Sequence, residues 1–140
     1  MSVPVNQRSE SKLEVCVKAR ELACYTLQIT KNKKIFVEEY QDAITNKIIR
    51  VALDIHMCVW AANNILVNSK EDFATRHALQ DKAALDCNIL LSLIDIAKPL
   101  FHLDTKRVIY WGRNTVNVRN MIRAWRDSDR KRYTKHLGVG

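Results

Sequence analysis

Glycine is almost absent from this chain of 140 residues. The first glycine is Gly112, and only Gly138 and Gly140 follow it. Strands joined by tight turns depend on glycine for backbone conformations of positive φ, so the composition disfavours an all-β fold. Before Gly112 the chain also lacks glycine-rich phosphate loops, dinucleotide-binding loops and the nucleophile elbow of hydrolases. The sequence therefore predicts an all-α protein.

Apolar residues recur at helical spacing in four segments joined by short connections. Four long helices on short connections predict an antiparallel four-helix bundle, which we expect to occupy residues 11–133. We expect residues 1–10 to form a flexible N-terminal lead-in. Residues 134–140 are expected to form a basic, flexible tail.

Local signals mark the ends of the expected helices. Ser11, followed by Glu14, is typical of a capping box at the start of the first helix. The second helix is expected over about 36–66, and the third directly after Ser69, with acidic residues in its first turn. Pro99 predicts the end of the third helix, because proline cannot continue the hydrogen-bonding pattern.

The net charge of +8 is confined to the last quarter of the chain. Residues 106–140 contain ten Lys or Arg and only Asp127 and Asp129, whereas residues 1–105 contain thirteen basic and thirteen acidic residues. Positive charge gathered in one segment indicates an anionic partner more than it indicates a fold.

The basic segment is expected to form one helix over 105–133. Its apolar side consists of Trp111, Thr115, Val118, Ile122 and Trp125, and a row of arginines lies beside it: Arg119, Arg123, Arg126 and Arg130. A planar guanidinium group binds two phosphate oxygens at once, so such a row suits nucleic acid. The candidate nucleic-acid-binding residues are Lys106, Arg107, Arg113, Arg119, Arg123, Arg126, Arg130, Lys131 and Arg132. The alternative is a solvated charged face whose arginine stems cover neighbouring apolar surface.

Two segments, 55–62 and 89–94, are apolar on more than one helical face. A helix of a monomeric bundle needs only one apolar stripe, so these segments favour self-association. The candidate residues of an oligomer interface are Met57, Val59, Trp60, Leu90 and Leu93. The alternative is that large side chains fill a wide bundle core.

No metal ion, organic cofactor or catalytic residue is expected. The histidines His56, His77, His102 and His136 are isolated, and no Glu-x-x-His pair of a di-metal bundle occurs. The cysteines form no Cys-x-x-Cys pair, which favours reduced, buried thiols at Cys16, Cys24, Cys58 and Cys87. Gln80 and Asn88 are candidate buried polar residues. The polar N-terminus and the lack of a long apolar run favour a soluble, cytoplasmic protein.

Several short strings carry a resemblance to a known family. They are Ala52-Leu53-Asp54-Ile55 and Ala62-Asn63 in the second expected helix, the string over 90–97 in the third and Trp125-Arg126-Asp127-Ser128-Asp129 in the fourth. Together with the basic fourth helix, the chain resembles the accessory variability determinant (Avd) of diversity-generating retroelements over residues 11–133. That family is related to the four-helix bundle proteins encoded in ribosomal RNA intervening sequences.

The resemblance implies a homopentameric, barrel-like ring of bundles with a basic surface. Such a protein would not be an enzyme: it would bind a reverse transcriptase and RNA or DNA, and would support cDNA synthesis in mutagenic retrohoming. Two alternatives remain open. One is a protein-only scaffold whose basic helix docks an acidic partner, and the other is a bundle protein of the intervening-sequence type.

Overall fold

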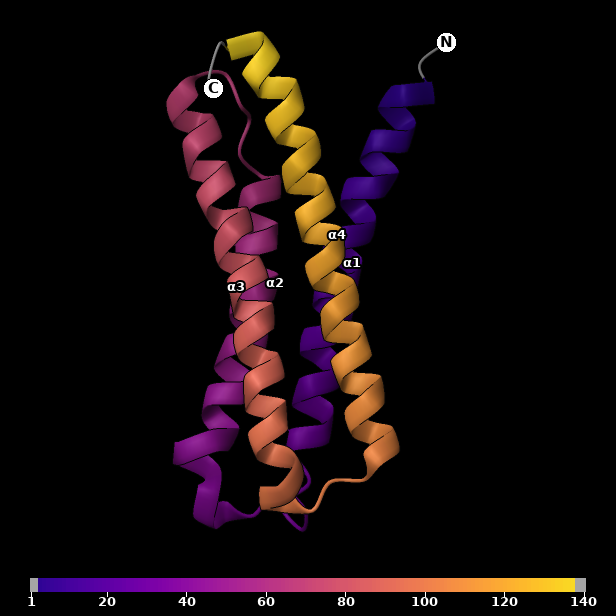
Figure 1. Cartoon of the computed structure of the whole chain (residues 1–140), viewed down its shortest axis with the longest axis vertical. Helices are drawn as coiled ribbons and strands as arrows, with labels where there is room; N and C mark the ends of the chain where they lie inside the picture. Colours follow the sequence, from indigo (N-terminus) through magenta and orange to yellow (C-terminus); the bar gives the residue numbers. More distant parts are fainter. Residues whose placement is uncertain (1–2, 138–140) are drawn as a thin grey trace.

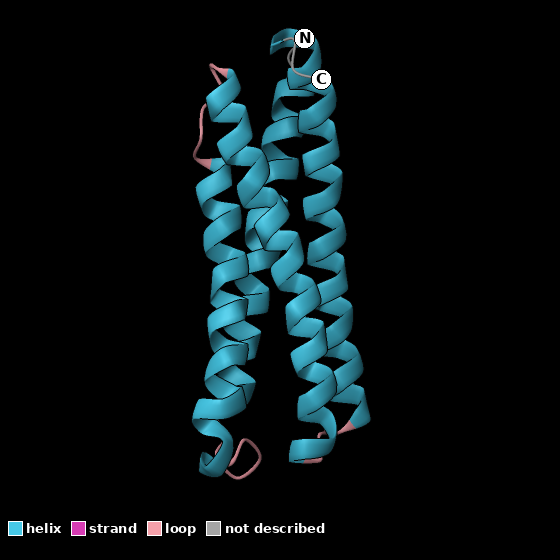
Figure 2. Ribbon diagram, turned by 60° about the vertical axis from the view of Figure 1, so that its left-hand side comes forward, coloured by secondary structure: helices cyan, strands magenta, loops and turns pink. Residues whose placement is uncertain are grey.

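The computed structural model describes the backbone of residues 3–137 and the side chains of residues 14–137. Over this range the chain forms four long helices and no strands, which confirms the all-α prediction and is consistent with a four-helix bundle. The helices run along one long axis (Figures 1 and 2). They are α1 (Val3–Thr30), α2 (Asn46–Asn63), α3 (Lys70–Phe101) and α4 (Thr105–Leu137). None of the helices within residues 3–137 is both long and apolar enough to cross a membrane.

One apolar core connects all four helices. Its fully buried large side chains include Leu22, Ile48, Ile55, Leu90, Ile94, Trp111 and Ile122. The predicted apolar side of α4 is confirmed, since Trp111, Thr115, Val118 and Ile122 are buried and Trp125 is half-buried. The indole Nε1 of Trp111 donates a hydrogen bond to Oγ1 of Thr26 at 3.1 Å, so the largest core side chain also has its polar atom satisfied.

The predicted start of α3 is confirmed by its cap. The backbone N–H of Asp72 donates to Oγ of Ser69 at 3.1 Å, and α3 begins at the next residue, Lys70. The start of α4 at Thr105 also agrees with the sequence. By contrast, α1 begins at Val3, so the capping box predicted at Ser11 lies inside the helix instead of at its start.

The second expected helix is shorter than predicted and irregular at its beginning. A 3₁₀ turn (Glu38–Tyr40) and a π-helical turn (Gln41–Thr45) precede α2. The side-chain amide of Gln41 donates a hydrogen bond to Oδ1 of Asn46 at 2.7 Å. This bond spans the π-helical turn, which is wider than an α-helical turn. At the other end, backbone and side-chain N–H groups of Asn64 both donate to the carbonyl of Trp60, so α2 ends at Asn63 and not near residue 66.

The third and fourth helices continue further than predicted. Pro99 lies inside the last turn of α3, where its missing N–H removes only one helical bond, and the helix ends at Phe101. His102 then adopts the left-handed conformation (φ 54°), and Leu103 N–H donates to the carbonyl of Lys98 at 3.0 Å. α4 extends to Leu137, so most of the predicted flexible tail is helical. Residues 1–2 of the lead-in and 138–140 of the tail lie outside the described residues.

Candidate nucleic-acid interface

The basic residues of α4 differ in exposure. Lys106, Arg113, Arg130 and Lys131 are exposed, and the remaining members of the predicted set are half-buried: Arg107, Arg119, Arg123, Arg126 and Arg132. Eighteen residues make five helical turns, so Arg113 and Lys131 lie on the same face of α4, and Lys106 lies close to that face. We call Lys106, Arg113 and Lys131 the outer basic face.

The predicted arginine row lies along the edge of α4 that faces α3. Three of its four guanidinium groups contact side chains of α3. In order along α4, these contacts are Arg119 Nη1 to Asn88 Oδ1 (2.9 Å), Arg126 Nη1 to Asp81 Oδ1 (2.8 Å) and Arg130 Nη2 to His77 Nε2 (3.5 Å). The arginine row therefore helps to hold α3 and α4 together. The alternative prediction, in which arginine stems cover neighbouring apolar surface, also gave these side chains a role in the fold.

These contacts leave most of the positive charge of the edge in place. Of the three partners on α3, only Asp81 is a carboxylate, and it also lies 3.4 Å from His77. Asn88 is an amide and does not neutralise Arg119. Asn88 is exposed, so the prediction that it is a buried polar residue is wrong, because its side chain turns toward Arg119 at the surface.

A buried ion pair that the sequence did not reveal joins α3 to the C-terminal half of α4. The Arg76 side chain, 3% exposed, binds the Asp129 carboxylate, 2% exposed, through Nε (2.7 Å) and Nη2 (3.2 Å). The amide of Gln80, buried as predicted, donates to the same carboxylate at 2.8 Å. Arg76 also donates to the carbonyl of Ile65 at 3.2 Å and lies over the ring of Trp125. The acidic charge of Asp129 is thus neutralised inside the bundle, away from the basic surface.

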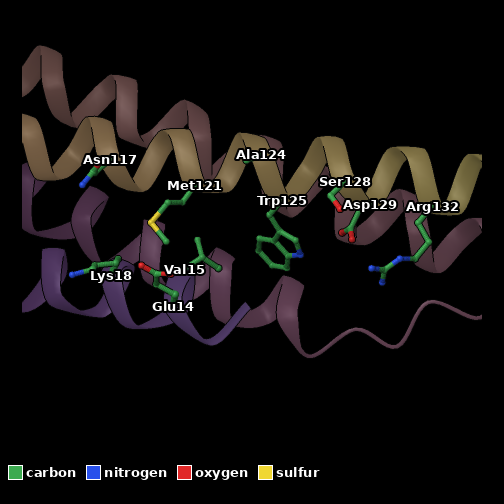
Figure 3. Close-up of a pocket in the computed structure, with 10 residues that line it drawn as sticks. All are labelled: Glu14, Val15, Lys18, Asn117, Met121, Ala124, Trp125, Ser128, Asp129 and Arg132. Carbon is green, nitrogen blue, oxygen red and sulfur yellow. The ribbon is translucent and has the colours of Figure 1, made fainter. Parts of the chain in front are cut away.

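A cavity of about 490 Å³ lies between α1 and α4. Figure 3 shows Met121 and Trp125 of α4 extending toward Val15 of α1, with Arg132 at one end and Lys18 at the other. No sequence pattern indicated this cavity, because it forms between helices at opposite ends of the chain.

A second polar cluster lies between α2 and α3. Ligand-type atoms of Asp54, Cys58 and Asp86 lie within 4.8 Å of one another, which is a spacing that a metal ion could bridge. The ammonium group of Lys82 contacts both carboxylates, so the cluster already contains a positive charge. The pKa of Asp86 is raised to about 6, mainly by burial and secondly by the neighbouring Asp54.

The outer surface of α2 and α3 carries exposed apolar side chains. Met57 is 54% exposed and Trp60 is 53% exposed, whereas Leu93 is half-buried. Val59 and Leu90 are fully buried in the bundle core, so we remove both from the predicted oligomer interface. Further exposed residues on the same two helices are Leu53, Leu85, Ile89 and Ile96.

The four cysteines differ in exposure. All four are free thiols; Cys58 and Cys87 are buried, as expected, and Cys16 is half-buried. Cys24 is exposed, so the expectation of four buried thiols is wrong at that position, because Cys24 lies on the solvent side of α1.

Comparisons with models of protein families, with curated proteins and with solved structures give no match. The charge and geometry of the surface are therefore the basis for a functional interpretation.

Proposed function

We propose that this protein is a non-catalytic accessory protein that binds RNA or DNA through α4 and acts with a reverse transcriptase. In this proposal antiparallel bundles assemble through the outer surfaces of α2 and α3 into a homopentameric ring, as the resemblance to Avd implies. The ring presents α4 several times, so that modest contacts from each subunit add as avidity. The complex supports cDNA synthesis, and the chemistry belongs to the polymerase.

The unbalanced charge of α4 is the observation that supports this function. Its outer basic face is exposed, and the acidic residue Asp129 is neutralised in the core by Arg76. Asp127 is the other acidic residue of α4, and it lies 3.5 Å from Arg126. A rigid helix that exposes an excess of cations attracts a polyanion, and phosphate contacts of this kind are largely independent of base sequence.

The test is a charge reversal confined to the outer basic face. We expect the triple variant Lys106→Glu, Arg113→Glu, Lys131→Glu to bind single-stranded RNA and DNA more weakly, by a similar factor for every sequence. The slope of log affinity against log salt should flatten by about 0.7–0.9 for each phosphate that the variant no longer neutralises. Arg119 and Arg126 are less suitable positions, because their reversal would also break the hydrogen bonds that join α4 to α3.

A matched control separates local binding from total charge. Lys31, Lys47 and Lys70 are exposed and lie outside α4, and their reversal to Glu changes the net charge by the same amount. Circular dichroism checks that both triple variants are folded. Equal loss of affinity in the two variants, or no loss in either, would contradict a binding surface on α4. If the basic face instead binds only an acidic protein, as in the scaffold alternative, we expect no salt-dependent binding to nucleic acid.

A further inference from the structure

The cavity between α1 and α4 is not used by the outer basic face. Its floor is formed by the buried Val15 and the half-buried Met121 and Trp125, whereas Ala124 and Lys18 at its rim are exposed. The cavity is therefore open to solvent and apolar at its base. Its volume of about 490 Å³ lies within the range of small-molecule sites, about 300–1,000 Å³.

Trp125 lines the cavity and has a hydrogen-bond donor without an acceptor. Its Nε1 atom is buried and has no hydrogen-bond partner among the described residues. A buried donor left unpaired is unfavourable, so a ligand acceptor that reaches this atom would be favoured. The guanidinium group of Arg76 lies over the indole ring, 5.1 Å from its centroid. Figure 3 shows the ring nitrogen on the side of Arg132.

Arg132 makes one end of the cavity cationic, whereas Glu14 and Lys18 lie together toward the other end (Figure 3). Arg132 and Lys18 contribute positive charge, and Glu14 contributes negative charge. Asp129 also lines the cavity, but its carboxylate is bound by Arg76 and Gln80. Lys18 lies 3.4 Å from Glu21 on the exposed surface of α1, so Arg132 is the more available cation.

We propose that the cavity binds one nucleotide of single-stranded nucleic acid. The base packs against Met121 and accepts the indole N–H of Trp125 edge to edge, while its phosphate contacts Arg132. Every base has ring-nitrogen or carbonyl acceptors at its edge and a flat face that packs against apolar side chains. An aliphatic chain would fill the same space but would leave the indole N–H unpaired. This inference rests on the proposed function, because the strand that enters the cavity is the one bound along α4.

The test blocks the cavity without changing any charge. Ala124→Phe places a ring at the cavity rim, and Ala78→Phe makes the same change at an exposed position of α3. We expect Ala124→Phe to bind a single-stranded oligonucleotide about tenfold more weakly than the wild type, since excluding the base removes its hydrogen bond and its apolar contacts. Ala78→Phe should bind like the wild type. An oligonucleotide without bases should bind both variants and the wild type equally.

Tryptophan fluorescence reports occupancy directly. A Trp60→Phe background leaves Trp125 and the fully buried Trp111. Oligonucleotide binding should quench the Trp125 part of the emission, and Ala124→Phe or Trp125→Phe should abolish that quenching. Trp125→Phe keeps an aromatic ring and removes the N–H, so it should weaken binding severalfold even if Ala124→Phe does not fold. Adenosine monophosphate alone should also quench, but only at a much higher concentration. If the mononucleotide quenches the fluorescence and the oligonucleotide does not, the proposal that the cavity binds a nucleotide of single-stranded nucleic acid is wrong.

The outcomes distinguish this inference from the proposed function. Salt-dependent oligonucleotide binding that is identical in the wild type, Ala124→Phe and Trp125→Phe overturns the inference and leaves the basic surface of α4 intact. If the wild type binds no oligonucleotide but the mononucleotide quenches Trp125, the cavity binds a free nucleotide, and the proposed function fails together with the strand assignment.

Discussion

The raised pKa of Asp86 links the stability of the fold to pH. Burial and the adjacent Asp54 raise its pKa to about 6, whereas the hydrogen bond with Asp86 lowers the pKa of Asp54. An unfolded aspartate has a pKa of about 3.9, so between about pH 4 and 6 the folded chain keeps a proton on Asp86 that the unfolded chain releases. The contribution of Asp86 to the free energy of unfolding therefore falls as the pH rises through this range.

Asp86→Asn should remove that dependence. The amide stays neutral and can still donate to Asp54, so we expect the variant to be more stable than the wild type at pH 7, by on the order of 1–3 kcal/mol. Its free energy of unfolding should not fall between pH 4 and 6. Urea denaturation at a series of pH values measures both effects. Asp95→Asn, an exposed change on the same helix, is the control, and a variant that follows the wild-type pH profile would contradict the prediction.

Single residues show what the sequence could not reveal. Arg76 and Asp129 are separated by 53 positions, and no local pattern pairs them. Asp129 looked like an ordinary surface acid of a basic helix, yet it is buried. Gln80 was predictable, because a polar residue within an apolar helical face must find a partner, but its partner was not. Burial of Val59 was missed because a helix segment that is apolar all round does not show which face meets the core.

At the scale of helices, the cap of α3 can be tested separately from tertiary packing. Ser69 Oγ accepts the N–H of Asp72, and Asp72 Oδ2 accepts the N–H of Asn68 at 3.0 Å. Ser69→Ala should therefore lower the free energy of unfolding by about 1 kcal/mol. Ser92→Ala, at an exposed interior position of α3, should leave stability almost unchanged or raise it slightly. Thermal denaturation compares the two variants, and equal effects would argue against the cap.

Helix boundaries were predictable where a few neighbouring residues determine them. Ser69 marks the start of α3 through its side-chain cap, and the predicted starts of α3 and α4 are both confirmed. The π-helical turn before α2 was not predicted, and the bond between the side chains of Gln41 and Asn46 spans that turn. Pro99 was interpreted as a stop, but in a last helical turn its missing N–H removes little, and the left-handed His102 ends the helix instead.

For the whole molecule, the exposed apolar surface of α2 and α3 makes a prediction about assembly. Trp60 is 53% exposed in the single chain, so Trp60→Glu should not unfold an isolated bundle. In an oligomer it would bury a charge, and we expect the variant to sediment as a smaller species than the wild type. Ile109→Glu changes an equally exposed residue on α4 and is the control. A wild-type protein that sediments as a monomer at high concentration would remove this prediction.

The buried pair of Arg76 and Asp129 has a consequence for the alignment of α3 and α4. These helices are 32 and 33 residues long, and their apolar sides repeat so regularly that sliding one past the other by two turns would again bring apolar side chains together. Sliding would also leave a buried guanidinium and a buried carboxylate apart, at a cost of about 3–5 kcal/mol. A purely apolar contact could be more stable, but several alignments would then have similar energies. With the ion pair, one alignment is clearly lowest, and the spacing of the cations along α4 relative to the rest of the molecule is fixed.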